Sequence, residues 1–149
     1  MSIFDNPDEF YMREALRQAH FAYDDDEIPV GAVIVSGDSI IACAYNQTER
    51  LSDVTAHAEM LAITAAANHL GAKYLTGCTL YVTLEPCPMC AAAAAWPQVS
   101  RIVYGASDPK RGYTQFSPTL LHPRTEVATG ILADESEALL KDFFKSKRG

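Results

Sequence analysis

Apolar residues near the start of the chain recur at the spacing of a helix. They are Met12, Ala15, Leu16, Ala19 and Tyr23, which fall on one helical face. Asn6 can cap this helix, because Pro7 then occupies its first position and Glu9 lies three residues after the cap. The pattern therefore predicts that the first element is a helix beginning at Pro7.

Strand-like and helical patterns alternate along the rest of the chain. Runs of β-branched and apolar residues predict strands at 30–35, 40–45, 79–84, 102–105 and 127–129. Helical patterns cover 57–70, 88–96 and 134–145. Turn residues 36–39 join the first two strands as a hairpin, and Gly71 closes the first of these helices. The alternation predicts an α/β fold: a three-layer α/β/α arrangement with a five-stranded mixed sheet, in which residues 1–149 form a single domain.

Composition excludes several classes of protein. Apolar residues make up 48% of the chain and charged residues 21%, as in a globular protein rather than a disordered one. The longest apolar runs are far shorter than the roughly 18 residues of a membrane span. Residues 1–10 also lack the basic and apolar regions of a secretory signal. We therefore expect a cytoplasmic protein whose cysteines are free thiols or metal ligands.

The distribution of charge matters more than its sum. A formal net charge of −7 by itself argues against a nucleic-acid partner. Residues 1–27 carry −6, from eight acidic and two basic residues, whereas residues 138–149 carry +3, from four basic residues and one acidic. We expect the acidic run Asp24–Glu27 to be a solvated surface turn. The basic end of the chain leaves phosphate binding open.

Two short motifs carry chemistry: His57-Ala58-Glu59 and Pro86-Cys87-Pro88-Met89-Cys90, which together form a zinc-binding pattern. Cys87 and Cys90 are three residues apart, so their sulfurs lie on one side of a first helical turn, where the helix N-terminus stabilises thiolates. His57 supplies a third ligand, and two thiolates balance the charge of Zn²⁺. This set leaves a fourth tetrahedral position for a water molecule, as in a catalytic site.

A closed, purely structural zinc site would need a fourth ligand. The candidates are Cys43, Cys78, His20, His69 and His122, and none has typical ligand spacing. Cys43 and Cys78 lie in or beside predicted strands, so we expect them to be small buried apolar residues. The sequence therefore favours the open, catalytic site.

Glu59 is the expected catalytic acid and base. It lies two residues after His57, so both side chains can reach one metal centre only if that centre lies beyond the end of the helix. A carboxylate beside a zinc-activated water can take up its proton and later deliver it, because Zn²⁺ lowers the pKa of that water to about 7. The alternative is that Glu59 is a first-turn residue that only stabilises the helix dipole.

These motifs and their surroundings resemble the cytidine-deaminase-like superfamily of zinc nucleobase deaminases. Within it, nearly the whole chain is similar to the bacterial tRNA-specific adenosine deaminases. The matching segments are Glu27–Ala32, Ala44–Asn46, Thr55–Glu59, Thr83–Cys87, Tyr104–Ala106, Asp108–Gly112 and Gly130–Glu135. The resemblance implies a cytidine-deaminase-like fold, one Zn²⁺ per chain, a homodimer, and zinc-dependent hydrolysis of adenosine to inosine at the first (wobble) anticodon position of tRNA.

The resemblance also implies which residues meet the substrate. Asn46 would hydrogen-bond the target base, and Asp108 and Lys110 would contact the sugar-phosphate backbone around it. Phe143 and Phe144, beside the basic residues at the end of the chain, would meet nucleotides that flank the target. From the residues alone, a turn asparagine, a solvated loop and two core or rim phenylalanines remain the alternatives.

Two other functions remain open. The segment Cys87-Pro88-Met89-Cys90 also occurs in related guanine deaminases, and the acidic net charge suits a neutral substrate. The enzyme would then deaminate a free nucleobase such as guanine. A zinc-stabilised binding module without catalysis is the third interpretation, against which the open fourth position and Glu59 argue.

Overall fold

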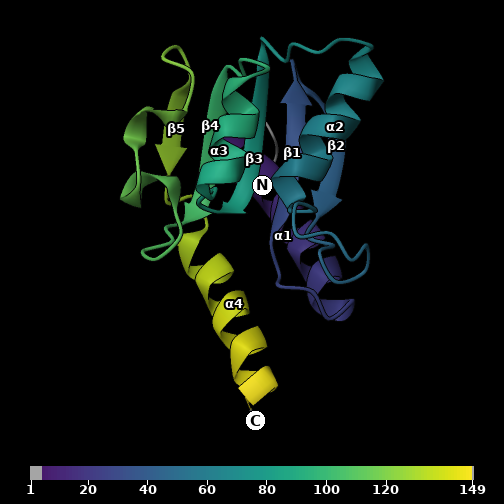
Figure 1. Ribbon diagram of the computed structural model, residues 1–149, viewed down its shortest axis with the longest axis vertical. Coiled ribbons are helices and arrows are strands. Elements are labelled where there is room, and N and C mark those ends of the chain that lie inside the picture. Colours follow the sequence, from purple (N-terminus) through teal and green to yellow (C-terminus); the bar gives the residue numbers. More distant parts are fainter. Residues whose placement is uncertain (1–4, 149) are drawn as a thin grey trace.

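Four α-helices flank a five-stranded sheet in residues 5–148, the part of the chain that the computed structural model describes (Figure 1). The elements are α1 (Pro7–Asp24), β1 (Gly31–Ser36), β2 (Ser39–Tyr45), α2 (Ala58–Leu70), β3 (Cys78–Leu84), α3 (Pro88–Ala95), β4 (Arg101–Ala106), β5 (Glu126–Thr129) and α4 (Ala133–Arg148). Within these residues, no helix combines the length and the apolar composition that crossing a membrane requires.

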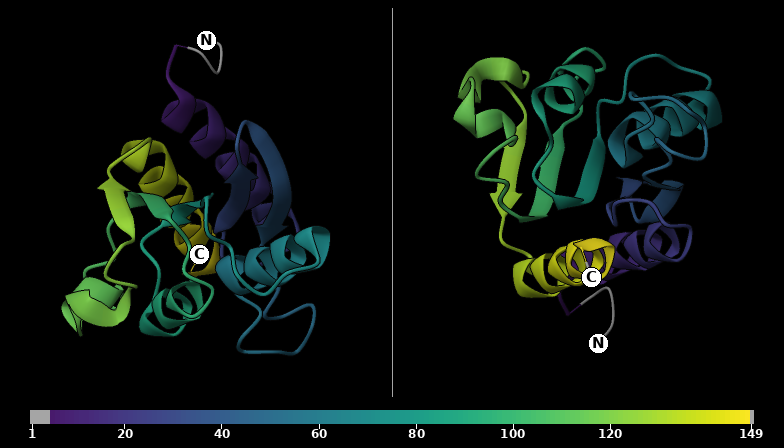
Figure 2. Two further views of the ribbon diagram at one scale, coloured as in Figure 1. Left: turned by 90° about the horizontal axis from the view of Figure 1, so that it is seen from above. Right: turned by 60° about the horizontal axis from the view of Figure 1, so that its bottom comes forward.

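The sheet is mixed, and its strand order is β2-β1-β3-β4-β5. β1 runs antiparallel to both β2 and β3, whereas β3, β4 and β5 are parallel. Helices α1 and α4 cover one face of the sheet, and α2 and α3 cover the other (Figure 2). This arrangement confirms the predicted α/β fold with three layers and a five-stranded mixed sheet.

The residues that the sequence predicts at the ends of helices do end helices in the structure. The Asn6 side chain accepts a hydrogen bond from the backbone N–H of Glu9 at 3.1 Å, which caps α1. Gly71 ends α2 in the left-handed conformation, with a φ of 63°. Two 3₁₀ helices, Tyr113–Gln115 and Pro118–Leu120, had no counterpart in the predicted elements, because three residues are too short to show a hydrophobic period.

The central strands are buried on both faces. Residues on the side of α2 and α3 include Ala32, Ile34, Leu80, Val82 and Ile102. Residues on the side of α1 include Val33, Val35, Tyr81 and Val103. Successive residues of a strand therefore pack into different halves of the core, because their side chains point to opposite faces of the sheet. The loops at the edge of the sheet are thus anchored to strands that are buried on both faces.

The expected solvated turn at Asp24–Glu27 is only partly correct. Asp24 to Asp26 are exposed, but Glu27 is buried, with 1% of its surface exposed. Its two carboxylate oxygens accept hydrogen bonds from the backbone N–H groups of Glu49 and Arg50, at 3.0 and 2.7 Å. Glu27 thus satisfies backbone donors of the loop between β2 and α2, a long-range contact that charge patterning along the chain does not reveal.

The carboxyl ends of β2, β3 and β4 lie along one edge of the sheet. Tyr45 at the end of β2 is opposite Gly31 at the start of β1, and Leu84 of β3 is opposite Ala106 of β4. The segments that follow these three strands therefore meet. In open α/β sheets, this edge is where ligands bind.

Candidate functional site

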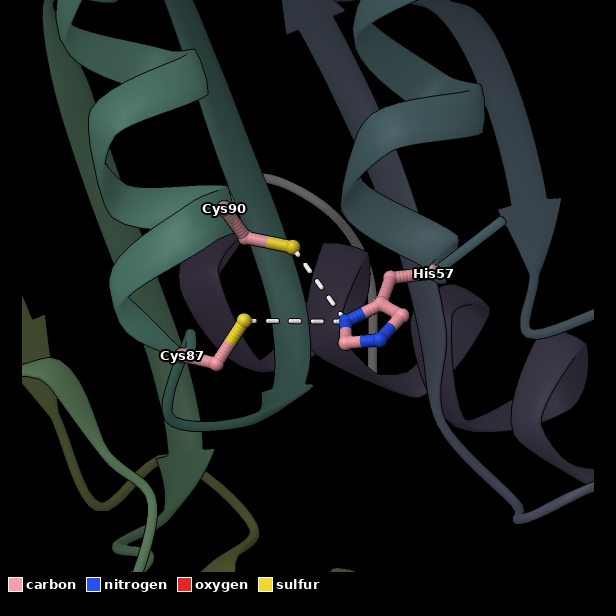
Figure 3. A group of neighbouring side chains, drawn as sticks. All are labelled: His57, Cys87 and Cys90. Carbon is pink, nitrogen blue, oxygen red and sulfur yellow. Dashed lines mark hydrogen bonds between the residues drawn. The ribbon is translucent and has the colours of Figure 1, made fainter. Parts of the chain in front are cut away.

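The side chains of His57, Cys87 and Cys90 meet where α2 and α3 begin (Figure 3). His57 is the N-cap of α2, and Cys87 is the N-cap of α3, whose first residue is Pro88. Cys90 lies in the first turn of α3, so its sulfur is on the same side as that of Cys87 (Figure 3). The Nδ1 atom of His57 is 3.6 Å from the Cys87 sulfur and 3.5 Å from the Cys90 sulfur.

These distances fit a tetrahedral zinc ion. Bond lengths of about 2.3 Å for Zn–S and about 2.0 Å for Zn–N place a sulfur and a nitrogen ligand about 3.5 Å apart. The ligand atoms of His57, Cys87 and Cys90 all lie within 4.8 Å of one another. Among residues 5–148, no other histidine, cysteine or carboxylate joins this group as a fourth ligand. The ligand set is therefore the open type with three protein ligands, and neither Cys43 nor Cys78 closes it. Cys78 is buried as expected, but the expectation was wrong for Cys43, which is exposed on the edge strand β2.

Local electrostatics favours a cation at this point. Hydrogen bonding from Cys90, helped by His57, lowers the pKa of Cys87 to about 4 although the thiol is partly buried. Contact with Cys87, together with burial, raises the pKa of Cys90. The contact with Cys87 also raises the pKa of His57. Without a metal, Cys87 is thus the thiolate of the pair. Zinc binding displaces the proton of Cys90 as well, because zinc binds cysteines as thiolates.

Glu59 lies in the first turn of α2, next to this group but outside the ligand set. Its side chain is buried, and burial raises the pKa of its carboxyl group to about 7. A carboxyl group with this pKa can both accept and donate a proton near neutral pH. His57 occupies the N-cap position, before the first helical residue Ala58. The side chains of His57 and Glu59 can therefore approach one metal centre beyond the helix end, although they are two residues apart.

A cavity of about 430 Å³ opens onto these residues. Its walls include Ile28, Asn46, Thr48, His57, Glu59, Glu85, Cys87, Ser107, Asp108, Arg111, Leu140 and Phe144. The sequence-derived residues Asn46, Asp108 and Phe144 are thus brought together with His57, Glu59 and Cys87. The volume is in the range of small-molecule sites.

Three sequence-derived residues do not line this cavity. Cys90, one of the three ligand residues, is fully buried. Lys110 is exposed on the loop after β4, and its backbone N–H donates to the Asp108 carboxylate at 3.1 Å. Phe143 is buried, with its ring 5.7 Å from that of Tyr23, whereas Phe144 is exposed and faces the cavity. Adjacent residues of a helix point about 100° apart, so the two phenylalanines divide between core and pocket.

Asn46 and Asp108 both take part in the architecture of the pocket walls. The Asn46 amide donates to the Ile28 carbonyl at 3.2 Å and accepts from the backbone N–H of Thr48 at 3.4 Å. One carboxylate oxygen of Asp108 accepts from the backbone N–H groups of Lys110 and Arg111, at 3.1 and 3.0 Å. Both side chains are therefore held in place before any substrate arrives.

Sequence reasoning missed several residues of the pocket walls, among them Glu85, Arg111 and Leu140. Glu85 and Arg111 occur inside segments that carry the family resemblance, which was the available signal for them. Leu140 had the helical periodicity of α4 and no other mark. None of the three belongs to a motif with its own chemistry, so only the fold shows that they face the cavity.

The layered sheet, the open His/Cys/Cys set at two helix starts and the buried glutamate beside it define a zinc-dependent hydrolytic enzyme. Residues 5–106 match the family described as the cytidine and deoxycytidylate deaminase zinc-binding region. The chain belongs to this family.

Similar proteins cover almost the entire chain. A protein named tRNA-specific adenosine deaminase, from Rickettsia felis, is 44% identical over 144 residues, which are 92% of this chain and 100% of that protein. A solved structure from a study of A-to-I editing by tRNA:A34 deaminases at the wobble position is 43% identical, with a TM-score of 0.82. The match covers 87% of this chain and 98% of that chain. The guanine deaminase from Nitrosomonas europaea is 26% identical, with a TM-score of 0.78 and coverage of 91% and 83%.

Proposed function

We propose that this protein is a zinc-dependent aminohydrolase that converts adenosine to inosine at the wobble position of tRNA. The observation that carries the chemistry is that Glu59 lines the same cavity as His57 and Cys87, two of the three grouped ligands His57, Cys87 and Cys90. The choice of substrate is supported by the tRNA-specific adenosine deaminase that matches along its full length. The structure from the study of tRNA:A34 deaminases supports the same choice.

His57, Cys87 and Cys90 would hold the zinc ion, which when bound would act as a Lewis acid and make water a usable nucleophile near neutral pH. Glu59 takes a proton from the attacking water and passes it to the purine ring. It then takes the remaining proton from the hydroxyl group added at C6 and transfers it to the leaving amino group, so that C6 becomes a carbonyl. Water adds at C6 and ammonia leaves, so adenosine and water give inosine and ammonia.

The substrate contacts are proposals that follow the family resemblance. Asn46 hydrogen-bonds the target base, and its position in the cavity wall beside Glu59 supports this role. Asp108 and Lys110 contact the sugar-phosphate backbone from the loop after β4. Phe144 meets a flanking nucleotide, because its exposed ring lies at the cavity. Phe143 is buried and supports this contact from behind.

Assembly and location are also proposed from the resemblance. We propose a homodimer of single-domain chains, for which the exposed side chain of Trp96 at the end of α3 offers an apolar contact. Sedimentation at several protein concentrations tests this assembly. We propose a cytoplasmic location, in keeping with a tRNA substrate and with the cysteine thiolate at the ligand set.

One assay tests the substrate. Zinc-loaded protein is incubated separately with an adenosine-bearing anticodon stem-loop, free adenosine, cytidine and guanine, and ammonia and products are quantified. We expect inosine in the stem-loop and no reaction of the three small substrates. No turnover of the stem-loop by protein that contains zinc would contradict the proposal.

Deamination of guanine is the second candidate function. It is favoured by the structural likeness to the guanine deaminase of Nitrosomonas europaea and by the Cys-Pro-Met-Cys segment. If the protein forms xanthine from guanine and does not react with the RNA, the substrate is guanine, and the proposed zinc chemistry still holds. A binding module without catalysis is disfavoured by the buried Glu59 in the cavity wall.

A further inference from the structure

Glu85 is a buried carboxylate that has no role in the proposed reaction. It follows the last residue of β3 and precedes Cys87 by two positions, and only 4% of its surface is exposed. One of its oxygens accepts a hydrogen bond from the backbone N–H of Asp108 at 3.0 Å. The other accepts from the backbone N–H and the hydroxyl of Thr114, at 3.1 and 2.7 Å. Three donors of one distant loop thus converge on a single carboxylate.

That loop forms a wall of the cavity. Ser107, Asp108, Pro109 and Arg111 all line it. Pro109 and Arg111 lie between the two residues that donate to Glu85, Asp108 and Thr114. The backbone is tied at the same places. The N–H of Glu85 donates to the Ala106 carbonyl at 2.8 Å, and the N–H of Tyr113 donates to the Pro86 carbonyl at 2.9 Å. Residues 107–114 are therefore held at both ends against the segment that leads into Cys87.

Gly112 shows how closely the loop approaches the carboxylate. A Cβ at this position would lie 2.1 Å from a carboxylate oxygen of Glu85 and 2.2 Å from its carboxyl carbon. The backbone of Gly112 has a φ of −62°, which any residue can adopt. Glycine is thus required here for space alone, and a larger residue would displace the carboxylate from its three donors.

We propose that Glu85 is a positioning residue that sets the distance between the 107–114 wall of the substrate pocket and the metal-ligating side chains. Its carboxylate is the shared acceptor of the loop, and its backbone is continuous with Cys87. The wall therefore keeps its place relative to the site of reaction when a substrate binds. The inference rests on the proposed deaminase function, because its readout is substrate turnover.

The first test is the variant Glu85→Gln. The amide replaces one accepting oxygen by an NH₂ group, which then faces backbone N–H or hydroxyl donors. We expect KM for the anticodon stem-loop to rise about 10-fold to 100-fold, in line with lost hydrogen bonds to a charged group. Zinc content and kcat should stay close to those of the unaltered protein, because the wall binds substrate and does not take part in proton transfer. Glu137→Gln is the matched control, since Glu137 is exposed and its only ion pair within the described residues 5–148 is with Lys141.

The second test approaches the same contact from the loop. Gly112→Ala should also raise KM, because its methyl group displaces the Glu85 carboxylate. The double variant Glu85→Gln/Gly112→Ala should be no worse than the more impaired single variant, because both changes break the same hydrogen bonds. Thr114→Val, which removes one of the three donors, should give a smaller rise in KM.

Several outcomes would overturn the inference. They are an unchanged KM in zinc-containing Glu85→Gln protein, a fall in kcat without a change in KM, and additive effects in the double variant. If Glu85→Gln does not fold, Gly112→Ala and Thr114→Val decide the question, and a normal KM in both would contradict it. If the unaltered protein ignores the stem-loop but converts guanine, the proposed substrate is wrong, and the same KM comparison is made with guanine.

Discussion

Three buried glutamates have different roles, which depend on the groups that their carboxylate oxygens contact. Glu27 and Glu85 accept hydrogen bonds from backbone donors of loops that are remote in sequence. Glu59 instead faces the metal-ligating residues, and burial raises the pKa of its carboxyl group to about 7. A carboxylate surrounded by N–H donors orders a loop, whereas a desolvated one beside a metal site can exchange protons.

The catalytic assignment of Glu59 predicts a loss of rate without a loss of metal. Glu59→Gln keeps the size of the side chain but cannot accept a proton from water. We expect kcat to fall by about 10² to 10⁴. Zinc content, measured by atomic emission, should be unchanged because Glu59 is outside the ligand set. A variant with normal turnover would refute the assignment.

The contacts of Glu27 predict a loss of stability. Glu27→Ala leaves the N–H groups of Glu49 and Arg50 without their acceptor in a partly buried place. The free energy of unfolding should fall by about 1 to 3 kcal/mol, which urea denaturation measures. Asp24→Ala, which changes an exposed residue of the same acidic run, should alter it by less than about 0.5 kcal/mol. Equal effects of the two substitutions would contradict the structural role of Glu27.

At the level of helices and strands, local signals account for most of what the sequence predicted. The Asn6 cap, the Gly71 helix end and the alternating strands act within a few residues of themselves. The zinc ligands were also predictable, because each lies in a short motif with its own chemistry. The burial of Glu27, the wall built around Glu85 and the positions of Lys110 and Phe143 depend on segments far apart in the chain. No local pattern encodes such contacts.

One such long-range contact joins α1 to β4. The Arg101 guanidinium donates to both oxygens of the Asp8 carboxylate, each at 2.7 Å, and the Tyr81 hydroxyl donates to the same group at 2.8 Å. Hydrogen bonding from Arg101 lowers the pKa of Asp8 from its ordinary value of 3.8, against the opposing effect of burial. A planar, two-point contact of this kind is stronger than an ordinary surface ion pair.

The lowered pKa predicts how stability depends on pH. A carboxyl group whose pKa is lower in the folded state stabilises the fold above its unfolded pKa, and this contribution is lost as pH falls through the folded pKa. The difference in unfolding free energy between the unaltered protein and Asp8→Asn should therefore be constant above about pH 5. It should shrink as pH falls below 3.8. Denaturant unfolding at a series of pH values measures this difference, and parallel curves throughout would show that Asp8 does not contribute in this way.

At the level of the whole molecule, charge is unevenly shared between the two helices on one face of the sheet. Acidic residues gather at the end of α1 and just after it, and basic residues at the end of α4, which extends past the edge of the sheet (Figure 1). Lys147 of α4 pairs with Asp26, so part of the positive charge is already compensated. Within residues 5–148, Lys145 is exposed and has no ion-pair partner.

This difference between two lysines predicts the salt dependence of RNA binding. Binding of the anticodon stem-loop to Glu59→Gln protein, which should not turn it over, is followed by fluorescence anisotropy at increasing salt. Affinity should fall steeply, because each phosphate contact releases counterions. Lys145→Ala should reduce the slope of log K against log salt by about 1, as expected for one lost phosphate contact. Lys147→Ala should reduce it less, since Asp26 already neutralises that charge. Equal slopes for Lys145→Ala and the protein with Lys145 would mean that Lys145 at the end of α4 does not contact phosphate. A free-base substrate would then account better for the net charge of −7.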